Sequence, residues 1–266
     1  MEAHANSTPD YLIDGLEYKL KPGASYITNR RGVTFWPTGA SSYSVNSSKV
    51  IKIQLNGDAM LDPSTVRFQF QLNNGDETAN HVLRTISGPW SFFRRLRVMC
   101  QGAVVEDISD YNRLHQMFDT LSSPHVRDNN DIEGFETRFD NVDTIINTAS
   151  MPGLEPNTSK VVSFKLLSGL FNQPKYLPIR YLNNLTIELE LVSSNLDPII
   201  DPAGGSDFTV DNTSSTWSIS EPQIKCDLCD LDNAVDNELV EQLLSGASIP
   251  HKLFYIQFTT TSRQWF

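Results

Sequence analysis

The stretch that decides the fold is Leu177-Pro178-Ile179-Arg180-Tyr181-Leu182-Asn183-Asn184-Leu185-Thr186-Ile187-Glu188-Leu189-Glu190-Leu191-Val192. From Leu185 onward, apolar side chains alternate with polar ones. This period of two is typical of a strand with one buried face and one face toward solvent or a partner. Pro178 cannot donate to a strand ladder, and Asn183-Asn184 suits a change of direction. The regular strand is therefore expected to begin after these residues.

The same alternation recurs elsewhere and predicts further strands at residues 49–55, 65–72, 160–166 and 217–229, the last interrupted at Pro222. The first two are expected to form a strand pair, with turn chemistry at residues 56–58 and 62–64 between them. Fourteen Gly and fourteen Pro along the chain supply the many turns that an all-β protein needs.

Two apolar runs, residues 90–100 and 103–108, flank Gln101-Gly102 and predict a hairpin in which Gly102 takes a positive φ. Three arginines lie beside three aromatic residues in the first run: Arg94, Arg95 and Arg97, with Trp90, Phe92 and Phe93. One interpretation is a surface for single-stranded nucleic acid, with bases stacked on the rings and phosphates held by the arginines. The favoured interpretation is an ordinary strand whose charged outer face is partly paired with Glu106 and Asp107 across the hairpin.

Helical spacing of apolar residues appears in two segments. Residues 109–121 predict a helix with Ser109 or Asp110 as N-cap, and residues 236–246 predict a short helix ending at Gly246. A strand pattern follows at residues 251–259. Residues 128–157 and 197–216 are long polar segments, expected to be surface loops that contact partners.

The totals exclude several classes of protein. The 266 residues carry a net charge of -11, which argues against a chain built mainly to neutralise nucleic-acid phosphates. No run of 18 apolar residues occurs, and the polar first ten residues do not form a secretory signal. The three cysteines, Cys100, Cys226 and Cys229, are too few for a disulfide framework and favour synthesis in a reducing compartment.

Residues with metal-ligating or catalytic chemistry do not fall into a motif. Cys226 and Cys229 form a single C-x-x-C, and on a strand this spacing places the two thiols on opposite faces. His115 and His125 lack further ligands at zinc-like spacing. Neither a nucleophile elbow nor a His-Glu-x-x-His motif is present. We therefore expect no metal, no cofactor and no enzymatic activity.

Several segments together resemble a known family. They are Asp58-Ala59-Met60-Leu61-Asp62-Pro63-Ser64-Thr65-Val66, Gly88-Pro89-Trp90-Ser91-Phe92-Phe93-Arg94-Arg95-Leu96-Arg97, residues 102–108, Asp110-Tyr111-Asn112-Arg113 and residues 169–191. They resemble the double jelly-roll major capsid proteins of polinton-like viruses and virophage relatives, over most of residues 33–266. The matching positions are Pro63, Trp90, Phe92, Phe93, Arg94, Arg95, Gly102, Asp110, Tyr111, Asn112, Arg113, Pro178, Glu188 and Leu189.

The resemblance implies an all-β fold, a jelly-roll β-sandwich that is the first half of a double jelly roll with short helical insertions. The expected organisation is an N-terminal arm at 1–32 that docks on its own domain or on a neighbouring copy, and a first jelly roll at 33–234. A helical linker at 235–248 and the opening strand of a second, truncated jelly roll at 249–266 complete it.

The resemblance also implies a function. The expected protein is a structural major capsid protein of the virion, a homotrimer that forms pseudo-hexagonal capsomers of an icosahedral double-stranded DNA virus. Its partners would be neighbouring capsomers, penton and minor capsid proteins, without specific nucleic-acid binding. The alternative is a β-sandwich carbohydrate-binding module, which needs exposed aromatic platforms. The four tryptophans, Trp36, Trp90, Trp217 and Trp265, are dispersed and do not favour it.

Overall fold

The computed structural model describes residues 27–79, 81–123, 153–182, 184–200 and 213–245. The elements are β1 (Ile27–Phe35), β2 (Ser42–Tyr43), β3 (Val50–Leu55), β4 (Met60–Asn74), η1 (Pro89–Phe92), β5 (Phe93–Cys100), β6 (Ala103–Ser109), α2 (Tyr111–Leu121), β7 (Ser159–Lys165), β8 (Leu185–Leu191), β9 (Trp217–Leu231) and α4 (Asn233–Leu244). None of the helices in these ranges is long and apolar enough to cross a membrane.

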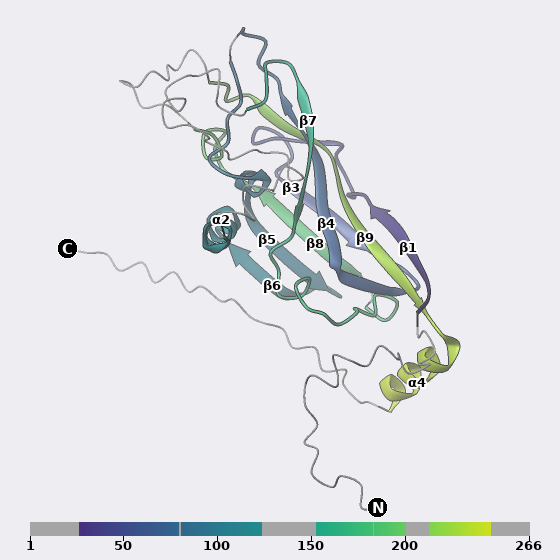
Figure 1. The fold of residues 1–266 in the computed structure, drawn as a ribbon. Coiled ribbons are helices and arrows are strands. Elements are labelled where there is room, and N and C mark those ends of the chain that lie inside the picture. Colours follow the sequence, from purple (N-terminus) through teal and green to yellow (C-terminus); the bar gives the residue numbers. More distant parts are fainter. Residues whose placement is uncertain (1–26, 80, 124–152, 183, 201–212, 246–266) are drawn as a thin grey trace, which may run out of the picture.

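The strands form two antiparallel sheets that pack face to face (Figure 1). One sheet, here called sheet A, has the order β1-β9-β4-β7, with β2 pairing β9. The other, sheet B, has the order β3-β8-β5-β6. Apart from the short β2, successive strands change sheet at each connection except the hairpin from β5 to β6. This arrangement of eight long strands is the jelly roll, so the predicted fold class is confirmed.

The core lies between the two sheets and follows the alternation of the strands. The apolar residues of β8, from Leu185 to Leu191, are each 1% exposed, as the opening stretch predicts. Across from them, Phe68 of β4 packs edge-to-face on Phe93 of β5, with ring centroids 5.4 Å apart. Interlocked aromatic rings of this kind add to the apolar area that both sheets bury.

The predicted pairing of residues 49–55 with 65–72 is wrong. Both segments are strands, but β3 lies in sheet B and β4 lies in sheet A. The chain crosses between the sheets at Gly57, where an added Cβ would stand 2.8 Å from Ile179 Cδ1. The turn residues suit a crossing as well as a hairpin, and the alternation is the same in both cases.

Two irregular places lie inside long strands and do not end them. Residues 62–64, predicted as a turn, belong to β4, which begins at Met60 and shifts register between Asp62 and Arg67. Pro222 lies within β9, and the preceding Glu221 has a φ of 50° where the register shifts again. Both are β-bulges, which tolerate residues that a regular ladder excludes.

The helices lie near the predicted positions. Ser109 belongs to β6, and Asp110 holds the N-cap position of α2 with a φ of 50° and no capping hydrogen bond from its side chain. The helix α4 begins at Asn233, before the expected start, and lies beyond the end of β9 (Figure 1). The strand β1 includes residues 27–32 of the expected arm. The remaining arm residues, most of the loop at 128–157, His125 and the strand at 249–266 lie outside the described residues.

Candidate assembly surfaces

The aromatic residues of the 88–97 motif are core residues. Trp90 is 3% exposed, and Phe92 and Phe93 are fully buried. The Trp90 ring stacks on His115 with centroids 4.1 Å apart, and its Nε1 donates to Gln116 Oε1 at 3.2 Å. An added Cβ at Gly88 would stand 2.5 Å from the Trp90 ring, so this glycine allows the close packing. Because the rings are buried, they cannot form a stacking surface for nucleic-acid bases.

The arginines of this motif are used on the outer face of sheet B. Arg95 donates to both carboxylate oxygens of Asp107 across the hairpin, at 2.7 and 2.5 Å, and this pairing lowers the pKa of Asp107. Arg94 donates to Ser193 Oγ at 2.9 Å. Glu106, the other expected partner, accepts instead from the Ser168 hydroxyl and the Gly169 N–H. The expected pairing is thus confirmed for Asp107 and wrong for Glu106.

Glu188 lies on the polar face of β8, as predicted, yet its side chain is only 4% exposed. Lys52 of β3 approaches one carboxylate oxygen at 2.6 Å, and Arg97 of β5 approaches the other at 2.7 Å. The side chains of Lys52 and Arg97 are themselves 53% and 32% exposed, so these ion pairs join a buried carboxylate to two cations at the surface. Its neighbour Leu189, 1% exposed, points into the core.

The Asp110-Tyr111-Asn112-Arg113 motif divides into a buried and an exposed part. The Tyr111 ring is fully buried, and its hydroxyl accepts the Leu167 N–H at 2.9 Å. The other three residues line a cavity of about 580 Å³, together with Arg94 and residues that include Ser87, Ser91, Gln116, Ser193 and Asp197. Within the described part of the chain, the side chains of Asp110 and Arg113 form neither an ion pair nor a hydrogen bond. The motif therefore places Tyr111 in the core and the charged side chains of Asp110 and Arg113 beside the cavity.

The remaining matching positions have structural roles. Gly102 has a φ of 82° in the β5–β6 turn, a conformation that favours glycine. Pro178 is buried, and its carbonyl accepts the N–H groups of Tyr181 and Leu182, which turns the chain toward β8. Pro63 is buried in the β4 bulge.

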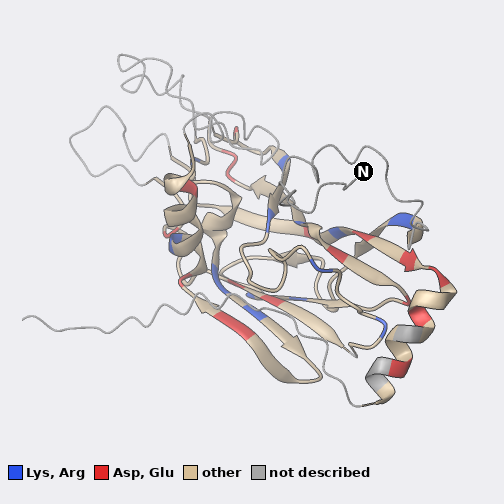
Figure 2. Ribbon diagram, turned by 60° about the horizontal axis from the view of Figure 1, so that its bottom comes forward, with Lys and Arg blue, Asp and Glu red and all other residues tan. Residues whose placement is uncertain are grey.

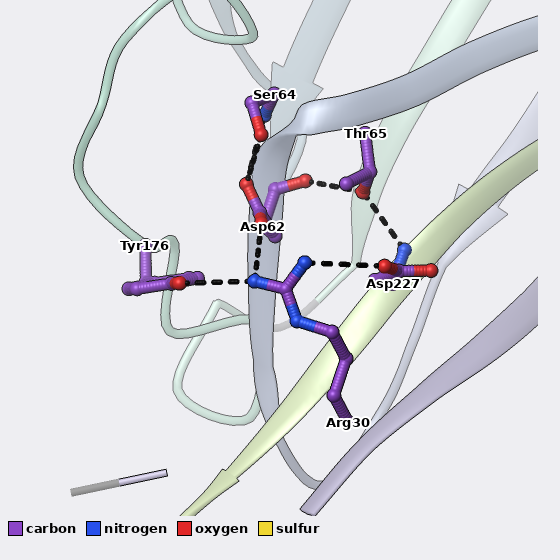
Figure 3. Close-up of polar contacts among 6 residues, drawn as sticks. All are labelled: Arg30, Asp62, Ser64, Thr65, Tyr176 and Asp227. Atoms are coloured by element: carbon purple, nitrogen blue, oxygen red, sulfur yellow. Dashed lines mark hydrogen bonds and ion pairs between the residues drawn. The ribbon is translucent and has the colours of Figure 1, made fainter. Parts of the chain in front are cut away.

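Around this bulge, a polar cluster joins β1, β4 and β9 (Figure 3). The Arg30 guanidinium approaches Asp62 at 2.7 Å and Asp227 at 3.3 Å, and it donates to the Tyr176 hydroxyl at 3.1 Å. Burial raises the pKa of Asp62, but hydrogen bonds from Ser64 and the charge of Arg30 outweigh it, so that the pKa lies below its usual value. We call Arg30, Asp62, Ser64, Thr65, Tyr176 and Asp227 the Arg30 cluster.

Within the Arg30 cluster, the Thr65 hydroxyl links β4 and β9 at the register shift. At the register shift in β4, the Asp227 N–H of β9 donates to Thr65 Oγ1 at 2.9 Å. The same hydroxyl donates to the Asp62 carbonyl at 2.8 Å. A side chain therefore accepts from a strand N–H at the irregular place, where such groups need a partner.

A second polar centre lies at the loop end of β4. Asn74 is 2% exposed, and its Nδ2 donates to the carbonyls of His81, Leu154 and Glu155 at 3.0 to 3.1 Å. Its Oδ1 accepts from the Ser214 hydroxyl at 2.7 Å. One amide therefore holds three loop segments together. The sequence reasoning missed both Asn74 and Arg30, because most of their partners lie far away along the chain.

The two cysteines of the C-x-x-C are both free. Cys226 belongs to the apolar core, and burial raises the pKa of its thiol to about 12. Cys229 is buried outside that core and pairs in register with Arg30. Over the described ranges, no group of three His, Cys, Asp or Glu side chains is placed to hold a metal ion.

No protein-family model and no curated protein matches this sequence. Three solved viral structures resemble the chain. The PBCV-1 virus capsid has 13% identity and a TM-score of 0.47, covering 84% of this chain and 45% of the other. The Sputnik virophage structure has 13% identity and a TM-score of 0.48, covering 88% and 53%. The Faustovirus major capsid protein has 8% identity and a TM-score of 0.46, covering 91% and 61%. The chain spans about half the length of the solved chains that it resembles.

Proposed function

We propose that this protein is a major capsid protein, a structural subunit that builds a viral shell by association with copies of itself. One observation carries the proposal. The motifs that resemble double jelly-roll capsid proteins fall at the corners and bulges of a jelly roll, where Trp90, Tyr111 and Pro63 fix the path of the chain. The proposed assembly is a homotrimer that forms pseudo-hexagonal capsomers of an icosahedral double-stranded DNA virus.

The architecture suits a building block. Two sheets enclose one aromatic core and give a stiff unit with loops at both ends. Each sheet ends in edge strands, β1 and β7 in sheet A and β3 and β6 in sheet B. Each of them has one neighbouring strand among the described residues, and residues 37–38 cover part of the outer edge of β3. Open strand edges, surface loops and the N-terminal arm are the surfaces through which such units associate.

The carbohydrate-binding alternative requires exposed aromatic platforms. Trp90 and Trp217 are each 3% exposed, so neither presents a ring face to a sugar. Trp36 is 55% exposed, and Trp265 lies outside the described residues. A single exposed ring does not make this alternative the better one.

The mass of the protein in solution tests the proposal. Size-exclusion chromatography with light scattering should give three times the chain mass, and electron microscopy should show particles with threefold symmetry. A protein that stays monomeric at every concentration contradicts the proposal. Binding of the same monomer to a panel of immobilised glycans would favour the alternative instead.

A further inference from the structure

Three cations lie directly side by side across sheet A. Lys225 of β9 pairs in register with Arg67 of β4, and Arg67 pairs in register with Lys165 of β7. Neighbouring strands lie about 4.8 Å apart, so the row spans about 10 Å. The core side chains Phe68, Phe164 and Ile224 are the next residues along the three strands, which places the row on the outer face of the sheet. We call Lys225, Arg67 and Lys165 the cationic row.

The cationic row has no acidic partner among the residues that the structure describes. Ion pairs hold the sheet cations Arg30, Arg31, Lys52, Arg95 and Arg97, whereas the three side chains of the row, like Arg94 and Lys160, form none. The nearest acid along β9 on the same face is Asp227, which is engaged by Arg30. Like charges directly opposite on adjacent strands destabilise a sheet. The isolated chain therefore bears a cost that an anionic partner would remove.

The residues beside the cationic row indicate the chemistry of that partner. The next register position along the three strands is uncharged, with Gln223 opposite Gln69 and Gln69 opposite Ser163. Gln69 and Ser163 are partly exposed and Gln223 is buried, so uncharged amide and hydroxyl groups border the line of positive charge. The chain has a pI of about 4.8, so nucleic acid is a poor match. A protein surface with carboxylates is a better match.

The chain itself is rich in surface carboxylates. It has 32 Asp and Glu against 21 Lys and Arg, and α4 contains acidic residues without a basic one (Figure 2). In a protein that associates with its own copies, this acid-rich surface is also the one present at the highest local concentration. Because the row and the acids lie on different parts of the molecule, the contact would join different surfaces of the two copies.

We propose that the cationic row is a docking site for an acidic surface of a second copy of this chain. The inference rests on the proposed function, since it names a contact within the assembly. It predicts that Arg67, at the centre of the row, disfavours the folded monomer and favours association.

The variant Arg67→Glu separates these two effects. A glutamate between two lysines removes the repulsion, so the thermal midpoint of the isolated chain should rise. The same change places a carboxylate against the acidic partner, so the dissociation constant for self-association should rise on the order of tenfold. Arg67→Gln should show a smaller rise of both. Lys49→Glu makes the same charge change at an exposed residue outside the row and should leave the dissociation constant within about twofold.

Sedimentation velocity at 50 and 500 mM NaCl measures the association, with the larger difference between variants expected at low salt because salt screens exposed charges. Unchanged association of Arg67→Glu, with an associating wild type, overturns this inference and leaves the proposed function intact. A wild type that does not associate contradicts the proposed function itself. Loss of binding to duplex DNA in Arg67→Glu, without an effect on association, would assign the row to nucleic acid and also overturn the inference.

Discussion

The Thr65 hydroxyl in the Arg30 cluster makes a quantitative prediction. In Thr65→Val, a methyl group replaces the hydroxyl at nearly constant shape, and two hydrogen bonds are lost: the one from the Asp227 N–H and the one to the Asp62 carbonyl. A hydrogen bond contributes about 0.5–1.5 kcal/mol net, so the free energy of unfolding should fall by about 1–3 kcal/mol. At about 2–4 °C per kcal/mol for a domain of this size, the thermal midpoint should fall by about 4–8 °C for a loss near 2 kcal/mol.

Urea unfolding followed by tryptophan fluorescence measures this loss, because the buried Trp90 and Trp217 report on the core. Thr65→Ser is the matched control, since it keeps the hydroxyl and loses only a methyl group, and it should lose at most about half as much free energy as Thr65→Val. Amide hydrogen exchange at Asp227 should accelerate in the valine variant alone. Equal losses in the two variants, or unchanged stability of Thr65→Val, would show that the hydrogen bonds of the Thr65 hydroxyl do not stabilise the contact between β4 and β9.

Three further changes test other contacts. Glu188→Ala should lower the free energy of unfolding by about 1–3 kcal/mol, because two cations lose a buried partner. The control Glu190→Ala, on the same strand, should lower it by less than about 1 kcal/mol. Urea unfolding measures both. Tyr111→Phe should cost about 1–2 kcal/mol and accelerate amide exchange at Leu167, whose N–H loses its acceptor. Burial lowers the pKa of His115 from 6.5 to about 4, so the unfolded chain binds this proton more tightly than the folded chain does. The free energy of unfolding should therefore be highest above pH 6.5 and should decline as the pH falls toward 4. NMR titration of the imidazole checks the pKa.

The strands and their buried faces could be predicted from sequence because alternation is a local signal. The apolar positions of β3, β4, β7 and β8 follow from the period of two, since a one-residue slip would turn every side chain to the wrong face. The β5–β6 hairpin followed from Gly102, whose positive φ marks the turn. Each of these signals lies within a few residues of the structure that it predicts.

The sheet to which a strand belongs carries no such local signal. Residues 56–58 allow a hairpin and a crossing between sheets equally, so the partner of β3 could not be found near it in sequence. The Arg30 cluster is even harder to predict from sequence. Arg30 lies 146 residues from Tyr176 and 197 from Asp227, and it falls in the segment that the sequence suggested as an arm. Long-range polar contacts of this kind depend on a topology that has to be known first.

The positions that resemble the capsid family fall into two groups, buried residues that stabilise the fold and exposed charged residues. Trp90, Tyr111 and Phe93 are buried and make contacts that stabilise the single chain, so folding alone accounts for them. Asp110 and Arg113 differ, because their exposed charges line a cavity and find no partner in the described part of the same chain. Exposed charges without a partner add little to stability, so the charge of Arg113 has no role in the described fold, whereas Asp110 still holds the N-cap position of α2 with a φ of 50°. Under the proposed function, a contact made after assembly would account for Arg113.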